Sequence, residues 1–431
     1  MISQILFAVI LFLAIALATH NARNIIGNIK LGRPIDRTDH PNKRWKIMLK
    51  VAFGQSKMTK RPIAFILHLL VYVGFVIINI ELLEMVLDGL IGTHRLFSPL
   101  GAYYNFLIAC FEWLALGVLF GCLLFLIRRN IIHIKRFFGT EMTSWPKTDA
   151  NLILLAEIAL MTAFLFMNAA DYKIQILRQE HPIIGAFPIS RHLFSLLPAH
   201  SASLHHMERL CWWFHIIGVL TFLNYLPYSK HLHIILAFPN TYFSNLNPKG
   251  QLANMPAITP EVKAMLDPSY VPSTGIEQPL HFGAKDVPDL TWKNLLDAYT
   301  CTECGRCTAV CPANLTGKLL SPRKIMMDTR DRMVEIGRLT KQNAIIDDDK
   351  TLLGHYITKE EIWACTTCNA CTEACPVTIN PLEIILELRR YLAMEESQVP
   401  TSIQTMFGNI ENNGAPWKYA QADRVNWRTE T

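Results

Sequence analysis

The sequence predicts an all-α membrane bundle of five transmembrane helices, followed by a small, mainly helical domain outside the membrane. Three observations support this fold class. The chain of 431 residues is 51% hydrophobic and only 18% charged, and the apolar excess lies in the first half. Five segments there reach the length of about 20 apolar residues that crosses a membrane. In the second half, one cysteine motif occurs twice within short helical patterns.

The apolar segments place the membrane helices at residues 2–19, 63–87, 104–127, 150–170 and 209–229. The first segment begins at Met1 with no basic residue before it, and its basic flank follows it. A cleavable secretory signal has the opposite arrangement. We therefore expect the first segment to be retained as a membrane helix.

The loops between these helices differ in charge. Residues 20–62 contain eleven Lys and Arg against Asp36 and Asp39, and the loop after 127 is also basic, whereas 88–103 and 171–208 carry little positive charge. The positive-inside rule then places the N-terminus in the periplasm and everything after residue 230 in the cytoplasm. We predict a multi-pass protein of the bacterial inner membrane. The net charge of +6 follows largely from this bias and requires no nucleic-acid partner.

Composition divides the chain into four parts. We expect a membrane domain at 1–238, a proline-rich connector at 239–290, a helical domain at 291–396 and an extended C-terminal tail at 397–431. In the helical domain, Ser321 and Pro322 have the residue types of an N-cap and a first helical position.

The repeated motif is the most specific signal in the chain. It reads CTECGRCTAVCP at 301–312 and CTTCNACTEACP at 365–376. This C-x2-C-x2-C-x3-C-P spacing is that of bacterial ferredoxins, in which three thiolates hold one [4Fe-4S] cluster and the fourth binds the neighbouring cluster. One predicted ligand set is Cys301, Cys304, Cys307 and Cys375, and the other is Cys365, Cys368, Cys371 and Cys311.

Zinc is the alternative metal, but it needs four ligands per site and has no use for the third step of the motif or the proline. The remaining cysteines, Cys110, Cys122 and Cys211, are isolated in or beside membrane segments, where they are expected to be small buried apolar residues.

Histidines in membrane helices indicate function, since their burial in lipid is costly. His215 and His233 are 18 residues apart, which would place them on one face of one helix about 27 Å apart, with a kink at Pro227. His68 lies near the cytoplasmic end of the second helix, as His233 does on the fifth. Two histidines from facing helices are a common axial pair of haem b. We therefore predict a haem between His68 and His233 on the cytoplasmic side.

His215 lies towards the periplasmic side, and the position where a facing ligand is expected is occupied by Ile78. It could hold an outer haem with a histidine from elsewhere (His94, His200, His205 or His206), or it could hydrogen-bond a quinone. Three acidic residues in the outer halves of the helices, Glu81, Glu84 and Glu112, either form a proton path to a quinone or cap helices at the interface.

These motifs carry a resemblance to known families. The five-helix half, with His215, Pro227 and His233, resembles the cytochrome b subunit of respiratory nitrate reductase and its relatives. That resemblance implies an inner haem held by His68 and His233, and Ile78 departs from it at the outer haem. The two motifs resemble the two-cluster iron-sulfur subunit of heterodisulfide reductase and membrane-bound electron-transfer-flavoprotein:menaquinone reductases. Larger relatives continue into cysteine-rich CCG domains, which implies a separate CCG-domain protein as partner, or a flavoprotein.

The predicted function is therefore electron transfer between a cytoplasmic redox partner and menaquinone or ubiquinone. The chain would be the electron-transfer component of a quinone-linked oxidoreductase complex in a lipid membrane, with two [4Fe-4S] clusters and haem b. Two other classes remain open: a non-catalytic iron-sulfur membrane anchor, and a redox sensor.

Overall fold

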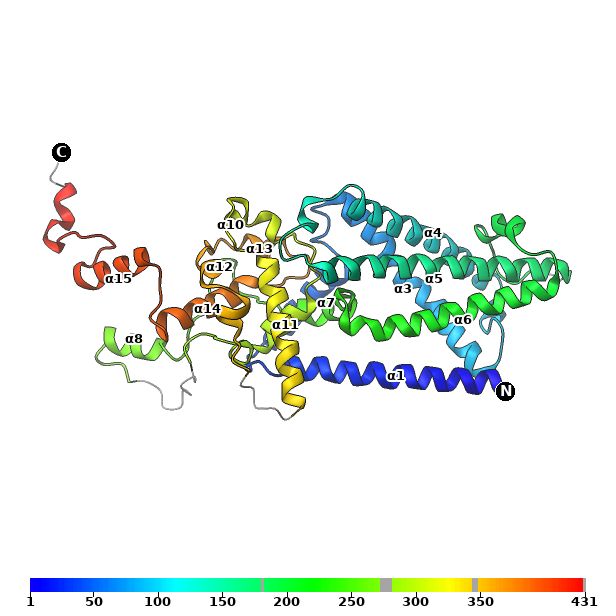
Figure 1. The fold of residues 1–431 in the computed structure, drawn as a ribbon, viewed down its shortest axis with the longest axis horizontal. Helices are drawn as coiled ribbons and strands as arrows, with labels where there is room; N and C mark the ends of the chain where they lie inside the picture. Colours follow the sequence, from blue (N-terminus) through cyan, green and yellow to red (C-terminus); the bar gives the residue numbers. More distant parts are fainter. Residues whose placement is uncertain (180–181, 272–280, 343–347, 429–431) are drawn as a thin grey trace. The chain divides into compact units, whose positions relative to one another are not determined.

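The computed structural model describes residues 1–179, 182–271, 281–342 and 348–428. Within these ranges the regular elements are helices, and the β pairings are the two isolated bridges Arg33–Thr291 and Leu353–Ile357. The chain divides into two compact units (Figure 1). The membrane unit comprises residues 1–27, 40–243 and 299–305, and the cysteine unit comprises residues 28–39, 244–298 and 306–431.

In the described part of the chain, five helical segments are long and apolar enough to cross a membrane, in agreement with the five predicted spans. They are α1 (Ile2–Ile29), α3 (Pro62–Ile91), α4 (Ala102–Asn130), α5 (Ser144–Leu177), and α6 (Ser201–Tyr225) with the short 3₁₀ turn η5 (Leu226–Tyr228). The first four extend beyond the C-terminal end of the predicted apolar run. The protein is therefore a multi-pass membrane protein.

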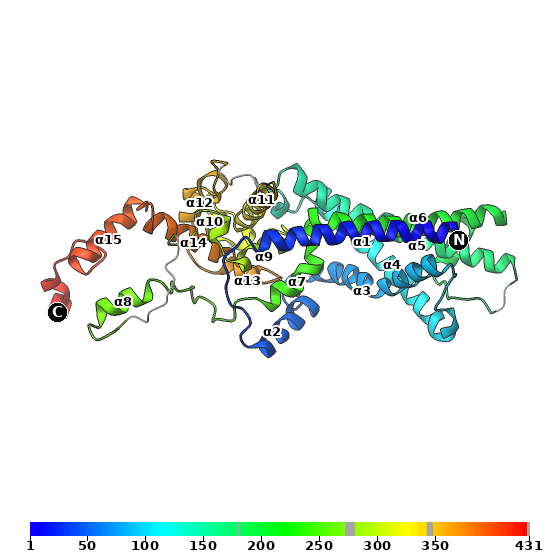
Figure 2. The same ribbon diagram turned by 90° about the horizontal axis from the view of Figure 1, so that it is seen from below.

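The membrane helices pack as a bundle (Figures 1 and 2), and buried apolar side chains form its core. Helices α3 and α4 approach closely through glycines: a Cβ at Gly74 would collide with Val118 Cγ2, and one at Gly121 would lie 3.3 Å from the Leu67 carbonyl oxygen. Small residues allow this approach between helices in lipid, where packing contacts drive association. Helix α1 joins the bundle through Phe7, whose ring lies 5.6 Å from that of Trp212.

The fifth membrane helix ends earlier than predicted. Helix α6 stops at Tyr225, η5 contains Pro227, and a second short turn, η6 (Lys230–Leu232), precedes α7 (His233–Tyr242). The prediction that His215 and His233 share one face of one kinked helix is therefore wrong. Proline removes a backbone donor and clashes with the preceding turn, and here it ends the helix. His233 becomes the first residue of α7, so it is oriented separately from His215.

The other short helices of the membrane unit cap the ends of the bundle. They are α2 (Pro41–Met48), the π-helix η1 (Leu49–Phe53), and the 3₁₀ segments η2 (Ser98–Leu100), η3 (Lys135–Phe137) and η4 (Ser190–Leu196). Helices α2 and α7 pack together, and the Trp45 and Tyr242 rings lie 5.5 Å apart.

The cysteine unit is built from short helices, as predicted. They include α9 (Trp292–Thr300), α11 (Pro322–Lys341), α12 (Lys359–Trp363) and α14 (Pro381–Met394), with the shorter α10 (Pro312–Leu315) and α13 (Ala370–Ala374) following the two cysteine loops. Ser321 caps α11 by accepting from the Lys324 backbone amide, which confirms the predicted N-cap. A buried ion pair joins Arg332 of α11 to Asp286, with a distance of 2.8 Å.

Two predictions about the irregular parts need correction. The stretch 239–290 contains α8 (Thr259–Leu266) and ends in core residues, since Ala284, Val287 and Leu290 are fully buried. Pro272 and Pro279 of this stretch lie outside the described residues. The tail is not extended throughout, because it forms α15 (Thr401–Asn413) and a 3₁₀ segment, η10 (Gln421–Arg428). Apolar residues of α15 recur at helical spacing: Ile403, Met406, Phe407 and Ile410.

Candidate electron-transfer site

The cysteine loops share one backbone pattern. In the first loop Glu303 and Gly305 have positive φ angles of 54° and 68°, and at the equivalent positions of the second loop Thr367 and Asn369 have 55° and 59°. Positive φ is costly for residues with a Cβ, and glycine and asparagine tolerate it best. The two loops therefore wind in the same way, as expected if each wraps its sulfurs around one corner of a cluster.

The four predicted ligands of the cluster built on the second motif act on one another electrostatically in pairs. Burial is the main cause that raises the pKa of the Cys365 thiol. The Thr367 amide and the nearby Arg389 oppose this rise in pKa, and Cys311 and Cys368 add to it. Burial raises the pKa of Cys371 to about 11, and Cys365 and Cys311 add to the rise. Cys311, from the first motif, is thus an electrostatic neighbour of the second. Metal binding would offset this effect, since a coordinated thiol is held deprotonated.

Backbone amides also point at these sulfurs. The Thr367 amide donates to Cys365 Sγ at 3.4 Å, and the Ile379 amide donates to Cys375 Sγ at 3.3 Å. Hydrogen bonds to sulfur tune the reduction potential of iron-sulfur clusters. Of the other predicted ligand set, Cys301 and Cys304 fall in the membrane unit, and Cys307 and Cys375 fall in the cysteine unit. That set remains a prediction.

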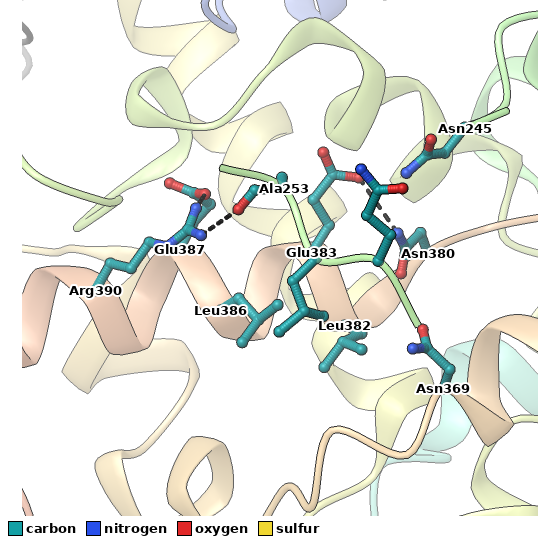
Figure 3. A pocket seen from close by; sticks show the side chains of 11 residues that line it. Asn245, Ala253, Asn369, Asn380, Leu382, Glu383, Leu386, Glu387 and Arg390 are labelled. Atoms are coloured by element: carbon teal, nitrogen blue, oxygen red, sulfur yellow. Dashed lines mark hydrogen bonds and ion pairs between the residues drawn. The ribbon is translucent and has the colours of Figure 1, made fainter. Parts of the chain in front are cut away.

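Cys368 is the one motif cysteine that is exposed. Close to it in sequence, Asn369 lines a polar pocket of the cysteine unit, between α14 and the segment 245–253 (Figure 3). Arg390 closes one side of this pocket by donating to the Ala253 carbonyl oxygen and pairing with Glu387. The second loop therefore has an accessible edge. Among the described residues, no three His, Cys, Asp or Glu side chains converge as ligands of a single metal ion would.

His68 and His233 face each other in the membrane unit. Their ring centres are 6.4 Å apart and the ring planes are inclined by 44°. Nδ1 of His68 lies 3.0 Å from Oε1 of Gln55, and Nδ1 of His233 lies 3.0 Å from the Lys230 carbonyl oxygen. In metal-binding histidines one ring nitrogen is usually fixed by an oxygen acceptor while the other binds the metal. By this rule Nε2 is the candidate ligand atom of both rings.

Lys230 connects this histidine pair to the first cysteine loop. While its carbonyl oxygen contacts His233, its ammonium group pairs with Glu303, between Cys301 and Cys304. Asp149 of α5 holds the same turn by accepting from the Lys230 amide at 3.1 Å and from the Ser229 hydroxyl at 2.7 Å. All these residues belong to the membrane unit. One lysine thus contacts both a candidate metal ligand and the loop of a candidate cluster.

His215 has a different environment. It is buried, with Nδ1 3.0 Å from the Leu160 carbonyl oxygen and its ring 6.1 Å from that of Phe164. Phe164, Ile216 and the predicted partner position Ile78 all belong to the apolar core. Among the proposed alternative partners, His94 contacts Asp171 at 3.3 Å and His205 contacts Arg178 at 2.8 Å.

A set of buried hydrogen-bonded side chains, here called the polar cluster, lies at the membrane-unit end that holds residues 92–101 and 182–200. Arg95 is at its centre and donates to Asp171 at 2.7 Å, Tyr104 at 3.0 Å and Asn168 at 3.1 Å. Two of the acids singled out in the sequence belong to it: Glu84 accepts from Tyr104, and Glu112 accepts from Asn168. The members are Glu84, Arg95, Tyr104, Glu112, Asn168 and Asp171.

Several of these residues were not predicted from the sequence. Arg95 is a lone cation in a short loop, and Gln55 has no motif around it. Asp149 and Lys230 read as ordinary flanking charges of apolar helices. The available signal was that Asp171 and Lys173 interrupt an apolar helix, which is uncommon inside membranes.

The doubled cysteine loops and the bundle of membrane helices define the class of the protein: a membrane protein with an iron-sulfur domain. Residues 300–379 match the family described as the 4Fe-4S dicluster domain, so the chain carries such a domain.

Particular relatives extend the similarity to the whole chain. The chain is 28% identical to a probable iron-sulfur-binding oxidoreductase, FadF, of Bacillus subtilis, over 99% of this chain and 61% of that protein. It is 27% identical to an EtfAB:quinone oxidoreductase of Syntrophomonas wolfei, over 92% of this chain and 55% of that protein. The chain thus spans less than two thirds of the length of both relatives.

A shorter match covers the cysteine motifs. Over 106 residues the chain is 36% identical to one subunit of a ferredoxin/F420H2-dependent CoB-CoM heterodisulfide reductase of Methanosarcina acetivorans, covering 24% of this chain and 52% of that relative. That relative is, by its name, one subunit of a larger enzyme. No solved structure matches the chain.

Proposed function

We propose that this protein transfers electrons between a cytoplasmic redox partner and the quinone pool, through two [4Fe-4S] clusters and one haem b. The observation that carries the proposal beyond iron-sulfur chemistry is the facing pair His68 and His233. Among the similar proteins, one is named as a quinone oxidoreductase, which supports a quinone as the membrane-side reactant.

The geometry of the pair fits an iron porphyrin. Metal to imidazole nitrogen bonds of about 2.0 Å on both sides of one iron, together with the size of the rings, put the ring centres roughly 6 Å apart. The 6.4 Å between His68 and His233 agrees with this value. Gln55 and the Lys230 carbonyl oxygen would hold the two rings in the orientation that presents Nε2. When bound, the haem would supply one-electron transfer within the bundle.

The clusters would be held by the ligand sets predicted from the motifs. The set Cys311, Cys365, Cys368 and Cys371 is supported by the mutual proximity of its thiols. For the set Cys301, Cys304, Cys307 and Cys375, the support is the matching backbone pattern of the first loop. Exposure of Cys368 suits exchange of electrons with a soluble partner, for which a CCG-domain protein or a flavoprotein remains our proposal.

The orientation proposed from the loop charges puts the N-terminus in the periplasm of a bacterial inner membrane, and the histidine pair and cysteine loops on the cytoplasmic side. The resemblance of the five-helix half to the nitrate-reductase cytochrome b subunit supports the same arrangement, with one haem near the cytoplasm. At His215, by contrast, Ile78 and Phe164 are part of the packed core, which favours a single haem.

The test is a redox titration of the purified native complex with an optical and metal inventory. We expect about eight iron atoms from two clusters per chain, one haem b, and re-oxidation of the reduced haem by a menaquinone analogue. Haem that is neither re-oxidised by the quinone nor reduced by the quinol would leave only an anchor or a sensor. Zinc in place of iron would refute the clusters.

Lys230→Met provides a further prediction about the path. It removes the ion pair to Glu303 while leaving the Lys230 carbonyl oxygen that contacts His233. Because small displacements of reacting groups cost up to about 100-fold in rate, we expect haem reduction by the pre-reduced clusters to slow by roughly tenfold in stopped-flow traces. Haem and iron contents should stay at wild-type levels.

The matched control for this experiment is Lys249→Met, which removes an exposed ion pair to Glu373 in the cysteine unit. Unchanged kinetics in Lys230→Met, or equal slowing in both variants, would refute the role of Lys230.

A further inference from the structure

Glu81 differs from the other described acids at the polar-cluster end of the membrane unit. Its side chain lies on the buried face of α3, it is 4% exposed, and its Oε2 atom has no hydrogen-bond partner among the described residues. The charged groups acting on it are Arg95, Glu84 and Glu112. An unpaired carboxyl oxygen in this position requires an explanation, because buried polar groups are almost always hydrogen-bonded.

The neighbouring carboxylates are all satisfied. Glu84 accepts from the Phe97 amide at 2.8 Å and from Tyr104, and Glu112 accepts from the Ile189 amide at 2.8 Å and from Asn168. Asp171 receives Arg95, His94 and Gln175. The donors named here are therefore already bonded to these three acids rather than to Glu81 Oε2.

The nearby cations are also engaged. The three guanidinium nitrogens of Arg95 donate to Asp171, Tyr104 and Asn168. Lys173 donates to two backbone carbonyl oxygens, those of Phe194 and Leu197. An ionised Glu81 would therefore add another carboxylate near Arg95, which already acts on Asp171 and Glu84, without a hydrogen bond to its Oε2 atom. Because buried charge without a hydrogen-bond partner is costly, the protonated form of Glu81 is the one that this environment favours.

The position of Glu81 along α3 is also informative. Glu81 follows Ile78 by three residues, which is about 4.5 Å along the helix axis. Ile78 belongs to the apolar core, together with Phe164, whose ring contacts that of His215. Glu81 thus lies where the polar cluster gives way to the apolar core. A lipid-soluble redox carrier would meet protein-bound protons at such a boundary.

We propose that Glu81 is the proton donor for the reduction of a quinone headgroup in the membrane unit. This inference rests on the proposed function, which supplies the two electrons. The quinone takes up two electrons and two protons. For one of these protons, the O–H bond of Glu81 breaks and an O–H bond of the hydroquinone forms. The Glu81 carboxylate then regains a proton from water, and water supplies the second proton of the hydroquinone.

The test compares Glu81→Gln with the wild-type complex. Glutamine keeps the size of the side chain but has no acidic proton to give. General acid catalysis contributes about 10² to 10⁴ in rate, so we expect re-oxidation of the reduced haem by a menaquinone analogue to slow by roughly 100-fold. Haem and iron contents should not change. Glu81→Asp, which keeps a carboxyl group, should recover part of the rate and shift its pH profile.

An independent readout is the infrared band of protonated carboxyl groups, recorded at neutral pH with the quinone absent. We expect Glu81→Gln to lose intensity that the wild type has. The matched control is Glu208→Gln, because Glu208 is equally buried but paired with Arg209. It should retain both the band and the rate.

Three outcomes separate the possibilities. Quinone reduction at the wild-type rate in Glu81→Gln overturns the inference, and so does an infrared band that is the same in that variant. Absence of quinone reduction in the wild type, with the Glu81 band present, refutes the proposed function instead and removes the donor role with it.

Discussion

Replacing His68 by alanine is expected to abolish haem binding, with loss of the haem absorbance of the purified complex. His68 and His233 are the only histidines in the described part of the membrane unit whose rings face each other across two different helices, α3 and α7, with Nδ1 held by an oxygen. In the proposed site, His68 and His233 together would hold the haem iron, and the variant would leave His233 alone to do so. The clusters should keep their iron, because no motif cysteine depends on His68.

His231 provides the sharpest control for this prediction. Its ring lies 5.4 Å from that of His233 and nearly perpendicular to it, and also contacts Phe222. If His231 were the ligand, His231→Ala would lose the haem and His233→Ala would retain it. We expect the reverse: His231→Ala keeps full haem content, whereas His68→Ala and His233→Ala lose it. Full haem in His68→Ala would refute the ligand pair.

Gln55 should influence how the haem ligand His68 is oriented, but haem should still bind without it. It has a positive φ of 48°, and its Oε1 contacts Nδ1 of His68. A backbone conformation of this kind persists only where the surroundings require it, and such positions often occur at functional sites. Orienting residues of this type modulate a metal ligand rather than replace it.

How much of this could be read from the sequence depended on how local the signal was. The membrane helices and the two cysteine loops follow from contiguous patterns, and both were predicted. The end of α6 was not, because the pattern shows Pro227 without showing whether the helix bends or stops there. Arg95 was missed because its partners Asp171 and Asn168 are more than 70 residues away in the chain. Lys230 was missed because its partner Glu303 lies 73 residues away in the chain, within the first cysteine motif.

The acids at the polar-cluster end give a second example of what the sequence alone does not distinguish. Glu81, Glu84 and Glu112 were noticed in the sequence because acids are unusual in membrane helices. Nothing in the pattern distinguishes them. The structure does, since Glu84 and Glu112 are hydrogen-bonded through both oxygens and Glu81 has an oxygen with no partner among the described residues. A proton-donating role is therefore assigned to one of three residues that look alike in sequence.

The second large effect is expected from Cys311→Ser, and it concerns which motif serves which cluster. Cys311 belongs to the first motif in sequence, but its thiol is an electrostatic neighbour of Cys365 and Cys371 in the second. We therefore expect Cys311→Ser to disrupt the same cluster as Cys371→Ser. Each variant should lose about four of about eight iron atoms, and the two should lose the same component of the electron paramagnetic resonance spectrum. Cys375→Ser should remove the other component.

A separation by sequence would give a different pattern. If each motif held its own cluster with its own four cysteines, Cys311→Ser would match Cys301→Ser, and Cys375→Ser would match Cys371→Ser. The control is Cys110→Ser, because Cys110 lies in α4 and is not part of either motif. It should retain all iron. If each cluster takes one ligand from the other motif, both clusters connect the two loops. Loss of either Cys311 or Cys375 should then also lower the thermal stability of the cysteine unit. If each motif held its own cluster, neither loss would remove a connection between the loops.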